Sequence, residues 1–225
     1  MQWEVYVKRC KKITETLLIG AMLAMVGGFL DVYTYICRGG VFANAQTGNL
    51  VIFGIKIAEG DYEDCFYYLI PVISFFLGIV VAEYIRRKYK DNNKIHWRQI
   101  VIAFETIVLA VIAFIPKNNN MLANILVSFV CSLQVQSFKK IYGNAYATTM
   151  CTGNLRSATE SLYEYKTSKN KSDLQKSLRY YGVIGFFMLG AVIGVLLINV
   201  FENKTIFFPC AVLAVVFVLI FIEEP

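Results

Sequence analysis

The sequence predicts an all-α integral membrane protein with six transmembrane helices and two short re-entrant helices, arranged as an inverted structural repeat. Three observations lead to this prediction. Hydrophobic residues make up 57% of the 225-residue chain, charged residues only 17%, and the mean hydropathy is +0.54. Basic residues gather in a few connecting segments, and the tetrapeptide Thr-Gly-Asn-Leu occurs twice, 105 residues apart. The hydropathy predicts the spans, the basic segments predict their orientation, and the repeated tetrapeptide predicts the two re-entrant helices.

Six apolar runs approach or exceed the ~18 residues that indicate a membrane span. They cover residues 14–36, 67–85, 99–116, 121–138, 180–201 and 205–222. The first run follows a basic stretch, as in a signal peptide, but it is too long and lacks a convincing small-residue cleavage site, so we expect it to be retained. The six runs leave no room for a soluble domain, and residues 1–225 are expected to form one membrane domain.

The positive net charge of +6 is placed in a way that predicts topology. Basic clusters lie at residues 8–12, 86–98, 139–140 and 166–179, whereas residues 59–64 are acidic. Basic loops stay in the cytoplasm, so both termini are expected inside. On this assignment Lys90 and Lys171 are cytoplasmic and Asp61 is extracytoplasmic. The charge therefore indicates orientation in a membrane and no nucleic-acid partner.

The segment 37–65 is expected to start and end outside the cell. A complete crossing by residues 47–58 would export the basic loop 86–98, against the charge rule. A re-entrant segment avoids this: an extended descent, a turn at Thr47-Gly48-Asn49 and a short helix back out. Ten extended residues cover about 33 Å and twelve helical residues about 18 Å, so the turn can reach the middle of the membrane.

A second corner, Thr152-Gly153-Asn154, is expected to re-enter from the cytoplasm within residues 141–165. Each half of the chain then contains a span, a corner and two further spans, as repeat one (13–117) and repeat two (118–225). Three crossings per half is an odd number, so the second half must be inverted. Inverted repeats recur in transport proteins, with interrupted helices meeting near the midplane.

Other positions agree with this division. Asp31 stands at the same offset of 105 residues from Gln136. The stretch FFLGIVVA (75–82) resembles FMLGAVIG (187–194), and each carries two small residues four positions apart. The repeat therefore extends beyond the corners.

The corners have a physical rationale. A helix that begins inside the membrane leaves its first N–H groups unpaired and presents the positive end of its dipole. Thr47 and Thr152 are candidate N-caps, and asparagine can bond freed backbone carbonyls. Gly48 and Gly153 are expected to sit where a side chain would strike the facing repeat. Gly39 or Gly60 is expected to tolerate alanine better, unless a positive φ is required there. The alternative is that the corners only stabilise a bent fold.

At this point the chain resembles a known family. GGFLDVYTYICRGGVFANAQTGNLVIFG and SLQVQSFKKIYGNAYATTMCTGNL are similar to the two half-signatures of the YoaK-like bacterial membrane proteins, a family of unknown function. The resemblance covers essentially the whole chain and implies the same multi-pass architecture in a bacterial plasma membrane. The motif positions are Asp31, Phe42, Thr47, Gly48 and Asn49 in the first half, and Gln134, Thr148, Thr149, Thr152 and Gly153 in the second. Ser132 and Val135 depart from it, where the family pattern has Gly and Asn.

Two acidic residues lie within apolar runs, where a bare charge is expensive. Asp31 either takes up and releases a proton or contacts a cation, or it accepts hydrogen bonds from re-entrant backbone N–H groups. The second interpretation is slightly favoured. Glu105 is similarly placed in the third run. Arg156 and Glu160, spaced i,i+4, are expected to pair.

Catalytic readings are poorly supported. His96 is the only histidine, and the six cysteines form no C-x-x-C pair. No Gly-rich phosphate-binding loop followed by Lys and Ser/Thr is present. We therefore expect no metal, no cofactor and no enzymatic activity.

Two classes of function remain. The first is a small-solute or ion channel or secondary transporter, with a site where the two corners meet; the second is a non-transporting scaffold or regulatory subunit. The expected solute path comprises Asp31, Thr47, Gly48, Asn49, Gln134, Gln136, Thr152, Gly153 and Asn154. Expected partners are the lipid bilayer, a small polar solute or ion, and a second copy of the chain.

Overall fold

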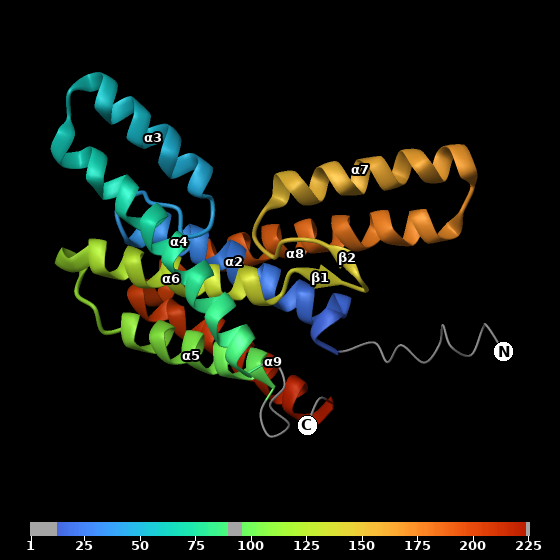
Figure 1. Ribbon diagram of the computed structural model, residues 1–225. Helices are drawn as coiled ribbons and strands as arrows, with labels where there is room; N and C mark the ends of the chain where they lie inside the picture. Colours follow the sequence, from blue (N-terminus) through green and yellow to red (C-terminus); the bar gives the residue numbers. More distant parts are fainter. Residues whose placement is uncertain (1–12, 90–95, 224–225) are drawn as a thin grey trace.

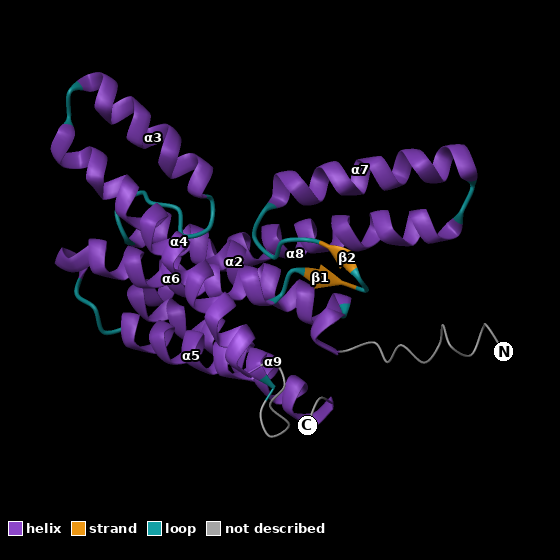
Figure 2. Ribbon diagram, viewed as in Figure 1, coloured by secondary structure: helices purple, strands orange, loops and turns teal. Residues whose placement is uncertain are grey.

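The computed structural model describes residues 13–89 and 96–223, which are helical almost throughout (Figures 1 and 2). The α-helices are α2 (Leu17–Cys37), α3 (Gln46–Glu59), α4 (Tyr62–Tyr89), α5 (Trp97–Ile112), α6 (Asn120–Ser137), α7 (Cys151–Ser168), α8 (Lys171–Phe201) and α9 (Phe207–Glu223). Short 3₁₀ helices are η1 (Ile13–Glu15), η2 (Lys117–Asn119) and η3 (Glu202–Ile206). One antiparallel hairpin joins β1 (Lys140–Ile141) to β2 (Asn144–Ala145).

The six apolar runs of the sequence all fall on helices: α2, α4, α5, α6, α8 and α9. Within the described residues, three helical segments are long and apolar enough to cross a membrane. They are Leu17–Cys37, Tyr62–Tyr89 and Lys171–Ile222, and the last contains α8, η3 and α9. The prediction of an all-α membrane protein is confirmed.

The helices pack in a regular set of pairs. α2 lies along α8, and α4 lies along α6. α3 forms a helical hairpin with α4, and α7 forms one with α8; the two hairpins point in different directions from the helical bundle (Figure 1). α5 packs against both α9 and α6, and α9 also contacts α2. These seven principal pairs are symmetric between the two halves of the chain. If α2, α3, α4 and α5 trade places with α6, α7, α8 and α9, respectively, the same seven pairs are obtained.

The largest apolar core lies between α2, α5, α6 and α9. It contains Phe29, Leu109, Val127 and Leu213, one from each helix, and none of the four has accessible surface. In a water-soluble protein, removing such a side chain from water contributes ~1.5–3 kcal/mol. Between helices in lipid, close packing provides the attraction instead. The core thus holds four of the long helices together beneath the two hairpins.

Glycines allow the closest helix crossings. A Cβ at Gly28 of α2 would meet the backbone oxygen of Phe187 of α8, and one at Gly190 of α8 would meet that of Met25. On the other pair, a Cβ at Gly78 of α4 would meet Ser132 and the backbone of α6. Small residues are the usual means of close approach between membrane helices. Gly78 therefore makes room for Ser132.

One end of the bundle is organised by Arg38. Its Nη1 donates to Ile115 O at 3.0 Å, and its backbone oxygen accepts from Tyr67 Oη at 2.8 Å. Lys117 forms an ion pair with Glu202 at 2.8 Å near this end. We call this the Arg38 end; it gathers the end of α2, the start of α4 and the connections α5–α6 and α8–α9.

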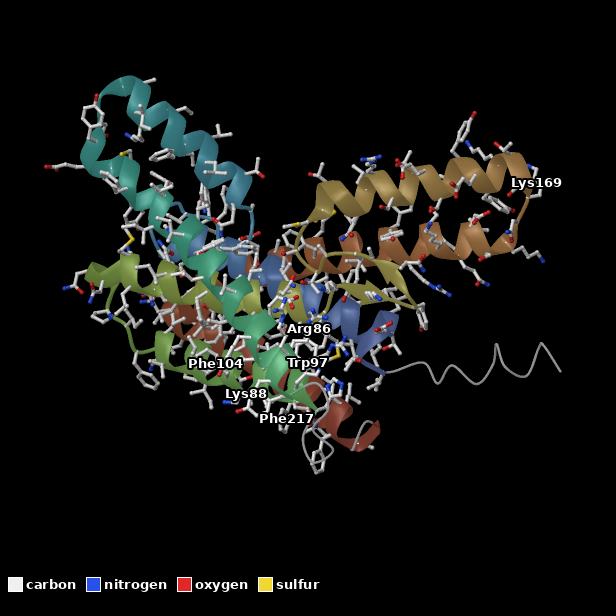
Figure 3. All side chains as sticks on the ribbon, viewed as in Figure 1. Arg86, Lys88, Trp97, Phe104, Lys169 and Phe217 are labelled. Atoms are coloured by element: carbon white, nitrogen blue, oxygen red, sulfur yellow. The ribbon has the colours of Figure 1, made fainter. Side chains whose placement is uncertain are left out.

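The opposite end is organised by Arg98. Arg98 Nε donates to Ser137 O at 2.9 Å, and Nη1 donates to Thr14 Oγ1 at 3.0 Å. Glu83 pairs with Arg86 at 2.6 Å and with Lys139 at 3.5 Å, which adds the end of α4 to this Arg98 end. Arg86, Lys88 and Trp97 are labelled here in Figure 3. The predicted cytoplasmic cations Lys8, Arg9, Lys11, Lys12, Lys90 and Lys94 lie outside the described residues.

A short hairpin precedes the second corner, and the sequence reading missed it. Its turn residues, Tyr142 and Gly143, both have positive φ (47° and 80°), the conformation of a tight hairpin turn. Tyrosine seldom adopts it, so the signal is weak. Tyr142 N donates to Glu15 O at 2.7 Å, and the Arg179 guanidinium lies 4.2 Å from the Tyr142 ring centre. These contacts fix the hairpin at the Arg98 end.

Candidate functional site

The asparagines of the two Thr-Gly-Asn corners make the same pair of hydrogen bonds. Asn49 Nδ2 donates to Phe42 O at 2.7 Å, and Phe42 N donates to Asn49 Oδ1 at 3.1 Å. Asn154 Nδ2 donates to Ala147 O at 2.6 Å, and Ala147 N donates to Asn154 Oδ1 at 3.3 Å. Each asparagine thus satisfies both backbone groups of the residue seven positions earlier. The prediction that they bond backbone outside the helix is confirmed.

The threonines of the corners are not helix caps. The N-caps of α3 and α7 are Ala45 and Met150, and neither side chain caps the helix. The prediction that Thr47 and Thr152 are N-caps is therefore wrong. The asparagine bonds hold the incoming chain against the first turn of each helix. Each helix begins one residue before its threonine. The first N–H groups of both helices lack a side-chain acceptor at the cap position.

Asp31 of α2 holds the chain that enters the first corner. Asn44 N donates to Asp31 Oδ1 at 2.7 Å, and Asn44 Nδ2 donates to Gly27 O at 3.2 Å. Thr34 Oγ1 accepts from Ala43 N at 3.2 Å. The bond from Asn44 N confirms that Asp31 accepts a backbone N–H of the corner; that the corner is re-entrant stays a prediction. A carboxylate has further lone pairs, so this bond does not exhaust its capacity.

Thr148 and Thr149 bring the second corner onto the same helix. Gln134 Nε2 donates to Thr148 Oγ1 at 3.1 Å and to Leu23 O at 3.3 Å. A Cβ at Gly27 would meet the methyl group of Thr149, so glycine is needed where Thr149 packs. Gly27 is the midpoint of α2 (Leu17–Cys37). Both corners therefore contact the middle of this helix.

A cavity of about 800 Å³ lies between the two corners. α2, α4 and α8 form its walls, and the N-terminal ends of α3 and α7 meet in it. The lining residues are Gly28, Asp31, Val32, Tyr35, Ile36, Phe42, Asn44, Ala45, Gln46, Thr47, Val72, Phe75, Phe76, Ile79, Thr149, Met150, Cys151, Thr152, Gly153, Phe187 and Ala191. This volume is in the range of small-molecule sites.

The cavity has a polar deep part and an apolar mouth. Asp31, Asn44 and Thr149 are 6%, 3% and 5% exposed, so they lie at depth. Tyr35 and Phe76, at 51% and 62%, lie at the mouth. Asn44 Oδ1 and Thr149 Oγ1 have no hydrogen-bond partner within the part of the chain that the structure describes. Unpaired polar atoms at depth in a cavity are the expected sign of a bound molecule or water.

Charge in the cavity comes from few groups. Among the described residues that line it, Asp31 carries the one ionisable carboxylate, and no lysine, arginine or histidine contributes. The N-termini of α3 and α7 each add a partial positive charge of about half a unit. A carboxylate and two helix dipoles therefore share the site, in an environment where apolar walls weaken screening by solvent.

The predicted path residues are only partly brought together. Asp31, Thr47, Thr152 and Gly153 line the cavity. Gly48, Asn49 and Asn154 belong to the first turns of α3 and α7 but are not among the lining residues, and Gln134 lies behind Thr148. Gln136 Nε2 donates to Glu83 at the Arg98 end, away from the corners.

Glycine at the corners does not have the role that the sequence suggested. A Cβ at Gly153 would meet no atom within 4 Å, and one at Gly48 would meet Phe42 of its own repeat at 3.1 Å. The prediction that both would strike the facing repeat is wrong. Gly39, expected to tolerate alanine, has φ of 85° and its Cβ would meet Tyr67. Asn44 and Thr149, one from each corner, instead both contact Gly27 of α2.

Two further features were missed by the sequence reading. Asn44 lies in the approach to the first corner and occupies the position equivalent to Thr149, 105 residues later, which is the signal that could have identified it. Arg38 is fully buried, and its guanidinium donates to Tyr33 Oη at 2.8 Å and to Ile112 O at 3.2 Å. It therefore caps the C-terminal end of α5, the end where a helix dipole favours a cation.

The other ionisable residues singled out lie elsewhere. Glu105 of α5 is fully buried, and neither carboxyl oxygen has a hydrogen-bond partner among the described residues. Arg156 pairs with Glu160 at 2.8 Å on the exposed face of α7, as predicted. Within residues 13–89 and 96–223, no group of three His, Cys, Asp or Glu side chains is placed to hold a metal ion.

Comparison with known proteins agrees with a membrane assignment. A family described as a protein of unknown function, DUF1275, matches residues 19–219. The chain is also similar to the UPF0700 transmembrane protein YoaK of Bacillus subtilis (strain 168). The two are 27% identical over 186 residues, which is 77% of this chain and 80% of that protein. No solved structure matches the chain.

Proposed function

Since the chain belongs to the DUF1275 family, we propose that this membrane protein is a channel or secondary transporter for a small solute or ion. Its site is the cavity between the two corners. The observation that carries the proposal is that Asn44 and Thr149, from opposite corners, line one cavity with unpartnered oxygens beside Asp31. A purely structural corner has no need of such atoms, because an unpaired buried polar group costs about 1–3 kcal/mol.

The proposal includes an inverted repeat of residues 13–117 and 118–225. Its support is the exchange of helix pairs, in which α2 with α8 corresponds to α6 with α4. We call the paired hydrogen bonds of Asn49 with Phe42 and of Asn154 with Ala147 the asparagine clamps. The two clamps are related by the same offset of 105 residues. Non-helical backbone at membrane depth is tolerated where it lines a cavity, which fits both corners.

The proposed topology has six spans, α2, α4, α5, α6, α8 and α9, with both termini in the cytoplasm of a bacterial cell. Its support is that segments assigned to one side contact one another. The Arg98 end collects Arg86, Arg87, Lys88 and Lys139, and the Arg38 end lies with the acidic turn between α3 and α4. That distribution follows the positive-inside rule.

Depth supports two re-entrant corners. Ser177 of α8 donates to Ala158 of α7 at 2.8 Å, seven residues beyond the start of α7 at Cys151. Seven helical residues rise about 10 Å. The start of α7 therefore lies about 10 Å deeper than Ser177, beside Phe187 in the apolar part of α8. α3 enters from the Arg38 end, so the two helix starts approach from opposite ends.

Transport would follow from this arrangement if access alternated. The two hairpins, α3 with α4 and α7 with α8, flank the cavity and are attached to different partners, α6 and α2. Rocking one hairpin pair against the other would open the site to one end at a time, as in other inverted-repeat transporters. We propose no enzymatic step and no cofactor. A homo-oligomer in the bilayer is compatible with the proposal.

The experiment is solute flux in proteoliposomes containing the full chain. A panel of small cations, amines, anions and neutral solutes is tested, and flux of at least one above empty liposomes is expected. Thr152→Phe, which adds a phenyl ring to the lining beside Gly153, should lower that flux, whereas Thr159→Phe on the exposed face of the same helix should not. Absence of flux across the panel would favour the alternative of a scaffold or regulatory subunit.

Sidedness is tested separately. In a variant without native cysteines, Cys at position 61 should react with an impermeant reagent from outside and Cys at position 171 only from inside. Labelling of both from the same side would contradict the re-entrant topology.

A further inference from the structure

We propose that the cavity binds a small amphipathic molecule with a protonated amine at one end and an apolar body at the other. This inference rests on the proposed function, because it names the class of solute that the shared site would carry. The amine would lie at depth, between Asp31, Asn44 and Thr149, and the apolar body would extend toward the mouth.

The deep part of the cavity offers acceptors that the protein leaves unused. Asn44 Oδ1 and Thr149 Oγ1 are buried and have no partner in residues 13–89 and 96–223. Asn44 is fixed through its Nδ2, which donates to Gly27 O at 3.2 Å, so its oxygen is the free atom. Thr149 packs against the same glycine. Both side chains are therefore held by the fold in positions where a donor from a ligand would pair them.

Asp31 supplies the charge for this group of acceptors. It lies four residues after Gly27 on α2, so the two positions are one turn apart on the same face of the helix. One of its oxygens accepts from Asn44 N at 2.7 Å, and a carboxylate has about four lone-pair directions in total. A primary ammonium carries three N–H donors, which matches one carboxylate and two neutral oxygens.

The rest of the cavity is suited to an apolar body. Phe75, Phe76 and Phe187 form much of the wall, and Tyr35 and Phe42 stack on each other with ring centres 4.8 Å apart. Aromatic faces also attract cations. A bare sodium ion would leave most of a volume of about 800 Å³ empty. An amine with an apolar body would fill it and place polar and apolar groups in matching surroundings.

A simple anion is a poorer fit. The N-termini of α3 and α7 attract negative charge, but each amounts to about half a unit. An anion at the deep end would meet the carboxyl oxygens of Asp31 and two further lone-pair oxygens, Asn44 Oδ1 and Thr149 Oγ1. A zwitterion could use both features, with its amine at Asp31 and its carboxylate at the helix ends. A simple amine and a zwitterion share the ammonium group, and the experiment distinguishes the two.

The test is calorimetric titration of the full chain in lipid nanodiscs with probes that share a phenyl body. We expect 2-phenylethylamine to bind at least about tenfold more tightly than 2-phenylethanol or 3-phenylpropionate, as for loss of a charge-assisted hydrogen bond. Phenylalanine binding more tightly still would assign a zwitterion, and weaker binding would assign a simple amine. Preference for the carboxylate or the alcohol would overturn the inference, as would binding of sodium without any binding of the amine.

Variants separate recognition from folding. Asp31→Asn should weaken binding of 2-phenylethylamine by about tenfold or more. Thr149→Val replaces the unpartnered hydroxyl with a methyl group, so it should weaken binding several-fold while leaving the thermal midpoint unchanged or higher. Thr148→Val is the matched control; it removes an acceptor of Gln134 and should lower the thermal midpoint without changing affinity. Equal affinity in the wild type and Thr149→Val would contradict the assigned head-group site.

Failure of this inference and failure of the proposed function give different results. Amine-selective binding without flux of any solute would leave the binding site standing and remove the transport proposal. Flux of an anion or neutral solute, with no selective amine binding, would keep the transport proposal and remove the amine. The two measurements on the same preparation therefore decide both questions.

Discussion

Asn44 and Thr149 stand 105 residues apart in the sequence and both contact Gly27, the midpoint of α2. Asn44 reaches it by a hydrogen bond from Nδ2 to the glycine oxygen at 3.2 Å, and Thr149 by packing its methyl group where a Cβ would lie. One comes from the corner that enters at the Arg38 end and the other from the corner that enters at the Arg98 end. Both corners are thus attached to α2 at the same residue.

The asparagine clamps are expected to contribute equally to stability. Asn49→Ala and Asn154→Ala each leave an N–H and a C=O group of the incoming chain without their partner, so each should cost about 2–4 kcal/mol in the free energy of unfolding. Unfolding in mixed micelles measures this. Asn144→Ala, which removes only long 3.4 Å bonds, is the control and should have little effect. A large loss in one clamp and none in the other would show that the two corners are not equivalent.

Removing the buried guanidinium should destabilise the Arg38 end. Arg38→Met leaves Tyr33 Oη and the carbonyls at the end of α5 without donors, and each hydrogen bond lost from a charged donor costs about 1.5–3 kcal/mol. Arg38→Lys should recover only part, because an ammonium cannot reproduce the forked contacts. Thermal unfolding of both variants is compared with Arg156→Met, which breaks an exposed pair and should change the midpoint little. Wild-type stability in Arg38→Met would contradict the capping role.

Glycine substitutions should separate helix crossings from corners. Gly28→Ala and Gly190→Ala place a methyl group against backbone of the facing helix, which should cost at least about 1–3 kcal/mol. Gly54→Ala and Gly153→Ala meet no atom within 4 Å and should be neutral or stabilise by up to about 1 kcal/mol through helix propensity. Expression level and unfolding of the four variants provide the comparison. A loss of stability in Gly153→Ala as large as that in Gly28→Ala would show that the corners are in direct contact at Gly153.

Glu105 should tolerate replacement of its carboxyl group by a neutral group of the same shape. Both carboxyl oxygens are buried without partners in the described residues, so Glu105→Gln, of the same shape, should change stability by less than about 1 kcal/mol. Glu105→Leu should be at least as stable as the wild type, because it removes unpaired polar atoms from the core. Both are measured by unfolding and by flux. A folded Glu105→Gln protein without flux would instead assign the carboxyl to solute or proton movement.

The turn between α3 and α4 should loosen in acid. Lys56 Nζ donates to Asp61 Oδ2 at 2.9 Å, and this hydrogen bond holds the pKa of Asp61 below its usual value. A depressed pKa means that the contact stabilises the turn above the ordinary pKa of aspartate and is lost as the pH falls through the folded-state pKa. The protection factor of the Gly60 amide, which corrects for the intrinsic pH dependence of hydrogen exchange, should therefore fall in acid. Asp61→Asn should show the lower protection factor already at neutral pH and lose this dependence.

The sequence predicted more of the architecture than of the site. Hydropathy placed α2, α4, α5, α6, α8 and α9, and the repeated tetrapeptide located α3 and α7, because these patterns depend on local chemistry. The bond from Asn44 N to Asp31 could be anticipated from a carboxylate in an apolar run. The burial of Arg38 and the unpaired oxygens of Asn44 and Thr149 depend on helices distant in sequence. No local pattern distinguishes a threonine whose hydroxyl is bonded, such as Thr148, from one whose hydroxyl is free.

The pairing of α2 with α8 and of α4 with α6 has a consequence for synthesis of the protein. When the ribosome has completed the first half, α2 and α4 both lack their principal partners, which emerge later. The first half therefore has to wait in the bilayer with Asp31 and its corner only partly enclosed, and folding is completed after α8 is inserted. Such long-range pairing slows folding and exposes intermediates. Two separately expressed halves should consequently be unstable alone and should assemble when they are produced together.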